Sequence, residues 1–242
     1  MADSIPMLVT AELAVGLAHT APWGVALDGL LAAQLWAQAK AGWRATGHSW
    51  ERARDAVCPP DLDLPLVRCE PNPDSALWHW AATCAWPGDH PQVTDVRSFT
   101  GRVDHRHLEQ VAPGLPRVVS ARQGRYRDRR MPVLVTPCKR VSWRAVGDPD
   151  TIRDLLETVG TIGKRRSSGE GQVLSWTVTE QPTLDPVAAA HLHPDGSLGR
   201  TVPDSCRQLF GEHLVDGGYG RAGIRPPYMH PARQVDLHLP AA

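Results

Sequence analysis

The sequence has few cysteines and no long hydrophobic run. It contains five cysteines in 242 residues, and no two of them are spaced as Cys-x-x-Cys. An odd number without such a pair argues against both a disulfide framework and a four-cysteine zinc site. No apolar run approaches the ~20 residues needed to cross a bilayer. Residues 1–4 also lack the positive start of a secretory signal. We therefore expect a cytoplasmic protein with reduced, mostly buried thiols and no membrane contact.

Lysine is also scarce, because only Lys40, Lys139 and Lys164 occur among 26 basic residues. The net charge is zero but is unevenly distributed. Residues 97–166 hold 16 basic and 7 acidic residues, which gives +9 (16 − 7), and the remainder carries −9 (10 − 19). Arginine suits bidentate phosphate contacts and stacking on bases. A basic middle in a neutral chain therefore indicates a local site for a polyanion.

Hydrophobic periodicity predicts alternating strands and helices. Alternation predicts a strand over Leu8–Leu17, with Val9, Ala11, Leu13, Val15 and Leu17 on one face. A helix is expected over Leu27–Ala41, and then a strand over Ala76–Trp86 whose three tryptophans are favoured as core. One or two strands broken near Pro137 are predicted in 132–146. Asp148 and Pro149 are typical of a helix start, and Gly160 of a helix stop before a strand over Gln172–Thr179.

This order predicts an α+β protein with a ferredoxin-like (RRM-like) βαββαβ core in residues 1–180. A basic, thumb-like insertion is expected at about 87–131, as a hairpin or a mobile loop. Residues 181–242 are rich in Pro, Gly and His and are expected to form an irregular C-terminal extension packed on the core.

The loop Gly160–Gly171 carries the clearest functional signal. Its glycines allow close backbone approach, and their N–H groups can hold phosphate oxygens. Lys164, Arg165 and Arg166 add positive charge, and Ser167 and Ser168 add hydroxyl donors. The loop leads into a strand, so it is not a Walker phosphate loop. A solvated basic turn is the structural alternative.

A helix, this loop and a strand together resemble the signature loop of the CRISPR-associated RAMP superfamily. Matching pieces lie at Leu27–Ala32, at Gly124–Tyr126 followed by Met131–Val133, and at Arg225–Tyr228. The set resembles the Cas-five-like (Csf-three) subunits of type IV effector complexes. The resemblance covers roughly residues 8–40 and 120–230, and residues 41–119 match nothing in it.

The resemblance implies a non-catalytic subunit that binds the 5′ handle of CRISPR RNA (crRNA) and caps the effector backbone. Its expected partners are crRNA, Cas-seven-like backbone subunits, a large or small effector subunit, and target DNA through the complex. The residues expected to bind RNA are Gly163, Lys164, Arg165, Arg166, Ser167, Ser168, Gly169, Gly171, Arg122, Arg125, Tyr126, Arg127, Arg129, Arg130, Lys139 and Arg140.

Two alternative functions remain open at this point. One is a metal-independent endoribonuclease in which His19 is the general base, with Tyr126 or Lys164 as its partner. The other is a structural subunit whose basic face binds an acidic protein. The pairs His105/His107 and His191/His193 lack a third ligand at a usual spacing, so no metal and no cofactor are predicted.

Overall fold

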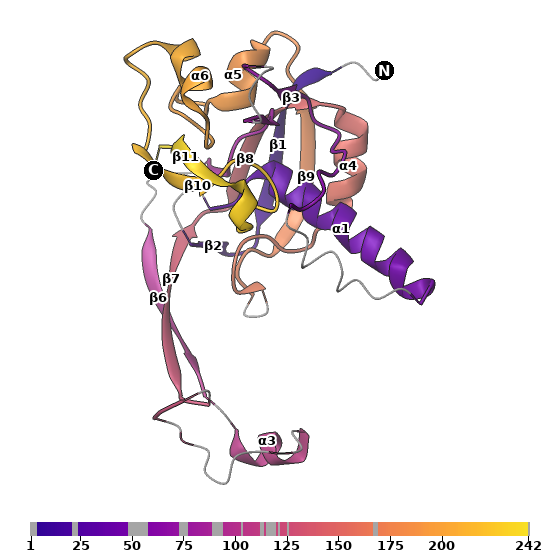
Figure 1. Cartoon of the computed structure of the whole chain (residues 1–242), viewed down its shortest axis with the longest axis vertical. Helices are drawn as coiled ribbons and strands as arrows, with labels where there is room; N and C mark the ends of the chain where they lie inside the picture. Colours follow the sequence, from indigo (N-terminus) through magenta and orange to yellow (C-terminus); the bar gives the residue numbers. More distant parts are fainter. Residues whose placement is uncertain are drawn as a thin grey trace.

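The protein combines helices with antiparallel sheets, which confirms the α+β class (Figure 1). The computed structural model describes residues 4–20, 24–47, 58–72, 77–88, 94–102, 104–111, 114, 120, 122–124, 126–166 and 169–241. Within this part of the chain, no helix is both long and apolar enough to cross a membrane.

A four-stranded sheet forms the centre of the body. Its strands are β5 (Trp86–Pro87), β8 (Arg140–Gly147), β1 (Ile5–Leu13) and β9 (Val173–Glu180), in that spatial order. Every neighbouring pair is antiparallel. The break near Pro137 is confirmed, because one strand ends there and β8 begins at Arg140.

Helices α1 (Leu27–Ala45) and α4 (Pro149–Glu157) pack against one face of this sheet in the main hydrophobic core. The start of α4 is as predicted, since the Asp148 side chain accepts hydrogen bonds from the backbone of Asp150 and Thr151. The helix ends at Glu157, short of the predicted stop at Gly160. On the opposite face, α5 (Pro186–His191) packs beside Val146 of β8.

Two predicted strands are shorter than expected. The first strand ends at Leu13, and β2 (Gly16–His19) leaves the central sheet to pair with another strand. Val15 lies at this break and is 50% exposed, so its predicted place on the buried face is wrong.

The strand predicted over Ala76–Trp86 is replaced by β4 (His79–Trp80), isolated bridges and β5. The segment pairs first with β3 (Arg68–Cys69) and then with β8 at Ala82. It next pairs with Ala26, just before α1, and then again with β8, and these changes of partner prevent one continuous ladder. Trp78 and Trp80 nevertheless contribute to the main core, as expected.

A long hairpin extends from the body (Figure 1). Its strands are β6 (Asp95–Gly101) and β7 (Arg129–Pro137), and β7 also pairs with β2. Helix α3 (His105–Val111) lies at the distal end. Most hairpin residues are exposed, so the hairpin has little core of its own.

The C-terminal region is more regular than the sequence predicts. It contains α5, α6 (Asp204–Arg207), η2 (Gln208–Phe210), β10 (Tyr219–Gly223), η3 (Pro231–Arg233) and β11 (Gln234–His238). Strands β10 and β11 pair with each other. Leu198, Val202 and Cys206 form a small core here, which packs against Cys69 near β4.

Candidate nucleic-acid interface

The glycine-rich loop is fixed against β2 by backbone hydrogen bonds. Lys164 N–H donates to the Ala18 carbonyl at 2.7 Å, and Gly171 N–H donates to the Gly16 carbonyl at 2.8 Å. Gly163 has φ 74°, and a Cβ at this position would lie 2.4 Å from the Ala18 carbonyl oxygen. Only glycine permits this approach. The loop is therefore a docked element and not a free solvated turn.

The loop also contacts the base of the hairpin. The Arg165 guanidinium lies over the Phe99 ring at 5.0 Å, and its Nη2 is 3.6 Å from Met131 Sδ. Glu170 is buried and pairs with Arg97 at 2.8 Å. These contacts couple loop and hairpin. Arg165, expected to bind phosphate, is instead half-buried in a contact with the protein.

A groove lies between the loop, α1 and the hairpin. One part, with a volume of about 290 Å³, is lined by Gly163, Lys164 and Arg166 of the loop and by the first turns of α1. A second part of about 270 Å³ is lined by Val96, Pro132 and other hairpin residues. His19, Thr20 and Lys164 line both parts, so the two depressions are adjacent. We call this adjacent pair of depressions the loop groove.

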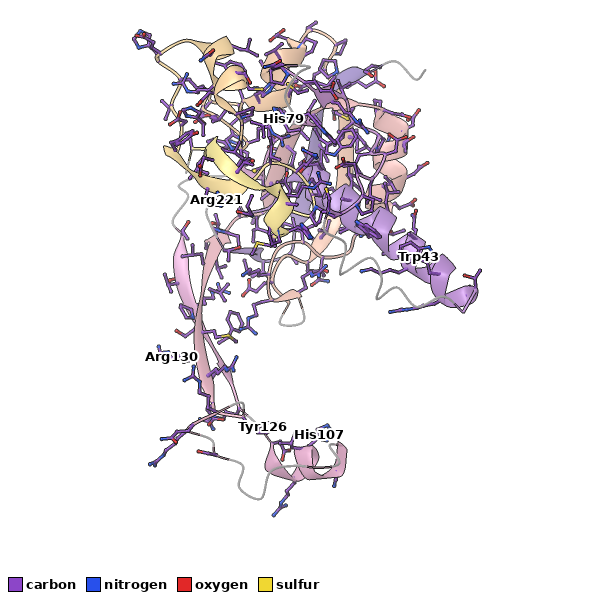
Figure 2. The ribbon with its side chains drawn as sticks, in the orientation of Figure 1. Trp43, His79, His107, Tyr126, Arg130 and Arg221 are labelled. Atoms are coloured by element: carbon purple, nitrogen blue, oxygen red, sulfur yellow. The ribbon has the colours of Figure 1, made fainter. Side chains whose placement is uncertain are left out.

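His19 lies in the wall of the loop groove, but it is only 2% exposed. Its Nε2 is 2.8 Å from the Thr136 hydroxyl. Lys164, one suggested catalytic partner, lines the same groove. Tyr126, the other, lies at the far end of the hairpin beside His107 (Figure 2). Among the described residues, no other histidine lines the groove.

The hairpin carries the remaining arginines that the sequence singles out. Arg122, Arg127, Arg129 and Arg130 line an open depression towards the distal end of the hairpin, and Arg130 lies part-way along it (Figure 2). The turn between β7 and β8 holds Lys139 and Arg140, both exposed, at the end of the sheet where the loop docks. Arg125, Ser167 and Ser168 lie outside the described residues.

Two of the sequence pieces, Leu27–Ala32 and Arg225–Tyr228, meet in space. The Tyr228 hydroxyl contacts both carboxylate oxygens of Asp28, at 2.6 and 2.8 Å. Arg200 Nη2 lies 3.7 Å from the same carboxylate. Burial raises the pKa of Asp28, and the Arg200 charge opposes this shift. Because Tyr228 also lines the loop groove, the C-terminal region forms part of its wall.

Sequence reasoning missed the roles of Asp28, Arg200 and Tyr228. One signal was present, since Asp28 is a lone carboxylate within the apolar start of α1. A charged group on the buried face of a helix needs a partner. The identity of that partner, some 200 residues away, is not encoded in the local pattern.

The chain matches no model of a known protein family and none of the curated proteins. Its function is therefore inferred from the loop groove and the charges around it.

Proposed function

We propose that this chain is a non-catalytic RNA-binding subunit of a type IV CRISPR ribonucleoprotein complex. In this role it binds the 5′ handle of crRNA and caps a backbone of Cas-seven-like subunits, beside a large or small effector subunit. The observation that carries the proposal is the docked glycine loop, which places exposed Lys164 and Arg166 on a groove between the body and a basic hairpin.

The strand order supports a ferredoxin-like core. In chain order the elements are β1, α1, β5, β8, α4 and β9, with β1 and β8 central, β9 and β5 at the edges, and both helices on one face. This order supports the expected βαββαβ plan, with the hairpin inserted between β5 and β8. RNA-recognition modules use this plan, although the fold alone assigns no function.

The groove suits an RNA backbone better than a base-specific contact. Lysine and arginine at its edge attract phosphates, and glycines permit a close approach of the ligand backbone. The basic hairpin extends the positive surface beyond the loop. A short, unstacked RNA end would therefore be held mainly through its phosphates.

The first prediction tests Lys164 and Arg166 together. The double variant Lys164→Ala/Arg166→Ala should weaken binding of repeat RNA and lower the salt slope of log K by about 1.4, at ~0.7 per single-strand phosphate contact. Filter binding across a salt series measures both quantities. Arg44→Ala/Arg153→Ala removes two exposed arginines from α1 and α4 and serves as the matched control. An equal loss of slope in both double variants would remove the loop from the binding site.

An endoribonuclease remains the second candidate, because His19 and Lys164 line the same groove. However, His19 is buried, and its Nε2 lies 2.8 Å from the Thr136 hydroxyl. A general base must instead reach the substrate proton that it removes. We expect wild-type protein in EDTA to leave repeat RNA intact. His19→Gln keeps a polar group near Thr136 and should leave the RNA length in the complex unchanged. A defined product with a 2′,3′-cyclic phosphate, lost in His19→Gln, would establish the nuclease instead.

A further inference from the structure

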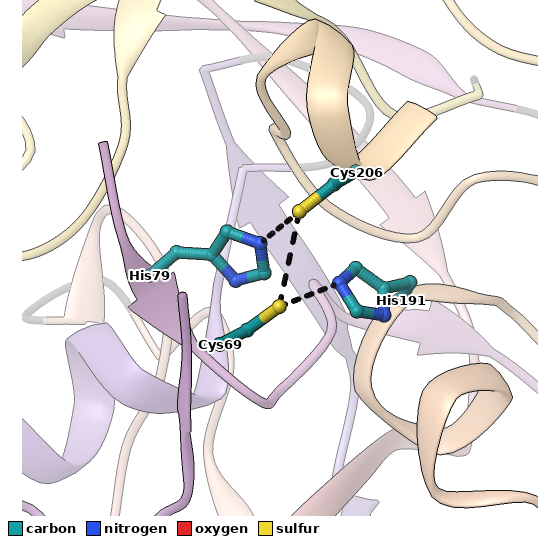
Figure 3. Close-up of side chains that lie close together, drawn as sticks. All are labelled: Cys69, His79, His191 and Cys206. Carbon is teal, nitrogen blue, oxygen red and sulfur yellow. Dashed lines mark hydrogen bonds between the residues drawn. The ribbon is translucent and has the colours of Figure 1, made fainter. Parts of the chain in front are cut away.

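Four side chains that can bind a metal meet away from the loop groove (Figure 3). Cys69 ends β3, and His79 is its directly paired neighbour on β4. His191 ends α5, and Cys206 lies in α6. Three of the four are buried, and Cys69 is half-buried. We call this group the Cys/His cluster.

Three distances within the cluster are close to those of a tetrahedral zinc site. All four potential ligand atoms lie within 4.8 Å of one another. The two sulfurs are 3.8 Å apart, Cys69 Sγ is 3.5 Å from His191 Nε2, and Cys206 Sγ is 3.2 Å from His79 Nε2. With Zn–S of about 2.3 Å and Zn–N of about 2.0–2.1 Å, tetrahedral angles require S···S of about 3.8 Å and S···N of about 3.5 Å.

Both imidazoles are oriented as zinc ligands. His79 Nδ1 lies 3.1 Å from the Trp80 carbonyl, and His191 Nδ1 lies 2.7 Å from the Val187 carbonyl. A carbonyl oxygen can only accept, so each Nδ1 carries the proton. The lone pair of each neutral ring is therefore on Nε2, which is directed at the sulfurs. Metal-binding histidines are fixed in this way by backbone carbonyls.

We propose that Cys69, His79, His191 and Cys206 bind one structural Zn²⁺. Two thiolates neutralise the ion, so the filled site adds no net charge to a buried region. Two sulfurs and two imidazole nitrogens in tetrahedral positions favour zinc among the common metals. Four protein ligands leave no position for substrate, which is typical of a structural and not a catalytic site.

A disulfide fits the cluster less well. The sulfurs of Cys69 and Cys206 are 3.8 Å apart, far from the ~2.05 Å of an S–S bond. A disulfide would also leave both Nε2 atoms without a role. The sequence predicts no metal, because no Cys-x-x-Cys pair occurs and His191 and His193 lack a third ligand at a usual spacing. Nine residues separate Cys69 from His79, and fourteen separate His191 from Cys206. Neither spacing is that of a common zinc motif, and only the fold unites the two pairs.

The metal would tie the C-terminal region to the body. Its ligands come from the β3–β4 pair and from helices α5 and α6. Next to it, Arg200 donates to the carbonyls of Trp80 and Ala82 and pairs with Asp28. Asp28 in turn holds Tyr228 in the groove wall. Zinc would therefore stabilise the wall of the loop groove without contacting a ligand there.

The metal content of the full-length protein tests this proposal. We expect about one zinc per chain by mass spectrometry after purification without chelator. Cys69→Ser and Cys206→Ser should lose the zinc and lower Tm by roughly 10 °C or more. Cys58→Ser changes an exposed side chain outside the cluster and should retain both zinc and Tm. The wild-type Tm should fall with chelator and recover with added Zn²⁺.

A Co²⁺-substituted wild type keeps the proposal testable if the cysteine variants do not fold. Tetrahedral cobalt with two thiolates should give visible d–d bands and near-ultraviolet charge-transfer absorption. The proposal would be overturned if the wild-type protein is folded without metal and its Tm changes with neither chelator nor added Zn²⁺. So would an intact mass about 2 Da low from a Cys69–Cys206 disulfide, or stoichiometric iron in place of zinc.

Discussion

At the residue scale, two glycines of the loop have positive φ for different reasons. Gly163 and Gly169 both have left-handed backbones, with φ 74° and 86°. A Cβ on Gly163 would strike the Ala18 carbonyl and the Leu17 side chain, whereas among the described residues nothing lies within 4 Å of one on Gly169. Gly163 is therefore required by the docking of the loop on β2, and Gly169 by its own conformation alone.

This difference predicts unequal costs for two matched substitutions. Gly169→Ala should lower the free energy of unfolding by about 1 kcal/mol, the cost of a left-handed alanine. Gly163→Ala adds a collision with backbone and should cost about 2–4 kcal/mol. Urea denaturation compares the two variants. Equal costs would show that the loop is not held against β2.

At the scale of elements, the β6–β7 hairpin is an exposed ribbon anchored at its base. The anchors are the pairing of β7 with β2, a small core of Ala18, Val133 and Val135, the Arg165–Phe99 stack and the Arg97–Glu170 ion pair. A two-stranded ribbon without a core is marginal by itself, so its distal half adds little to the stability of the body. In the proposed function, its arginines would instead provide surface for a phosphate chain.

A shortened hairpin tests this division. Gly101 pairs directly with Arg129, so residues 102–128 can be replaced by a two-residue Asn-Gly turn without changing the register. We expect Tm to change by no more than about 2 °C, while RNA affinity falls and its salt dependence weakens. Unchanged RNA binding by the shortened, folded protein would exclude the distal hairpin from the interface.

At the scale of the whole molecule, a buried polar network joins the two ends of the chain. Asp28 on α1 contacts Tyr228 and Arg200 from the C-terminal region; Asp28 and Arg200 are buried, and Tyr228 is half-buried. A buried carboxylate that loses a donor keeps its desolvation cost without compensation. The network is therefore expected to hold the C-terminal region against the core.

Tyr228→Phe removes the hydroxyl and little else. It should lower the free energy of unfolding by about 1–3 kcal/mol, because Asp28 loses its shortest hydrogen bonds. Tyr219→Phe is the control, since Tyr219 is 59% exposed and its hydroxyl makes a long hydrogen bond of 3.5 Å to the Asp236 carbonyl. Chemical denaturation measures both. If Tyr228→Phe leaves the free energy of unfolding unchanged, the network does not join the C-terminal region to α1.

The sequence by itself determined the features that depend on neighbours along the chain. The start of α4 at Asp148 and Pro149, the helix from Leu27, and the strand before Glu180 follow from capping and periodicity. The glycine loop and the basic middle of the chain are also visible as composition. These signals are local, so no fold is needed to find them.

Only the tertiary structure decided which distant residues meet. Val15 is exposed because β2 turns away to pair with β7, a choice of partner that alternation cannot encode. Arg165 stacks on Phe99 because the hairpin base lies beside the loop. The Cys/His cluster joins residues up to 137 positions apart, through strand pairing and helix placement. Such contacts depend on the whole packing of the chain, and no local spacing records them.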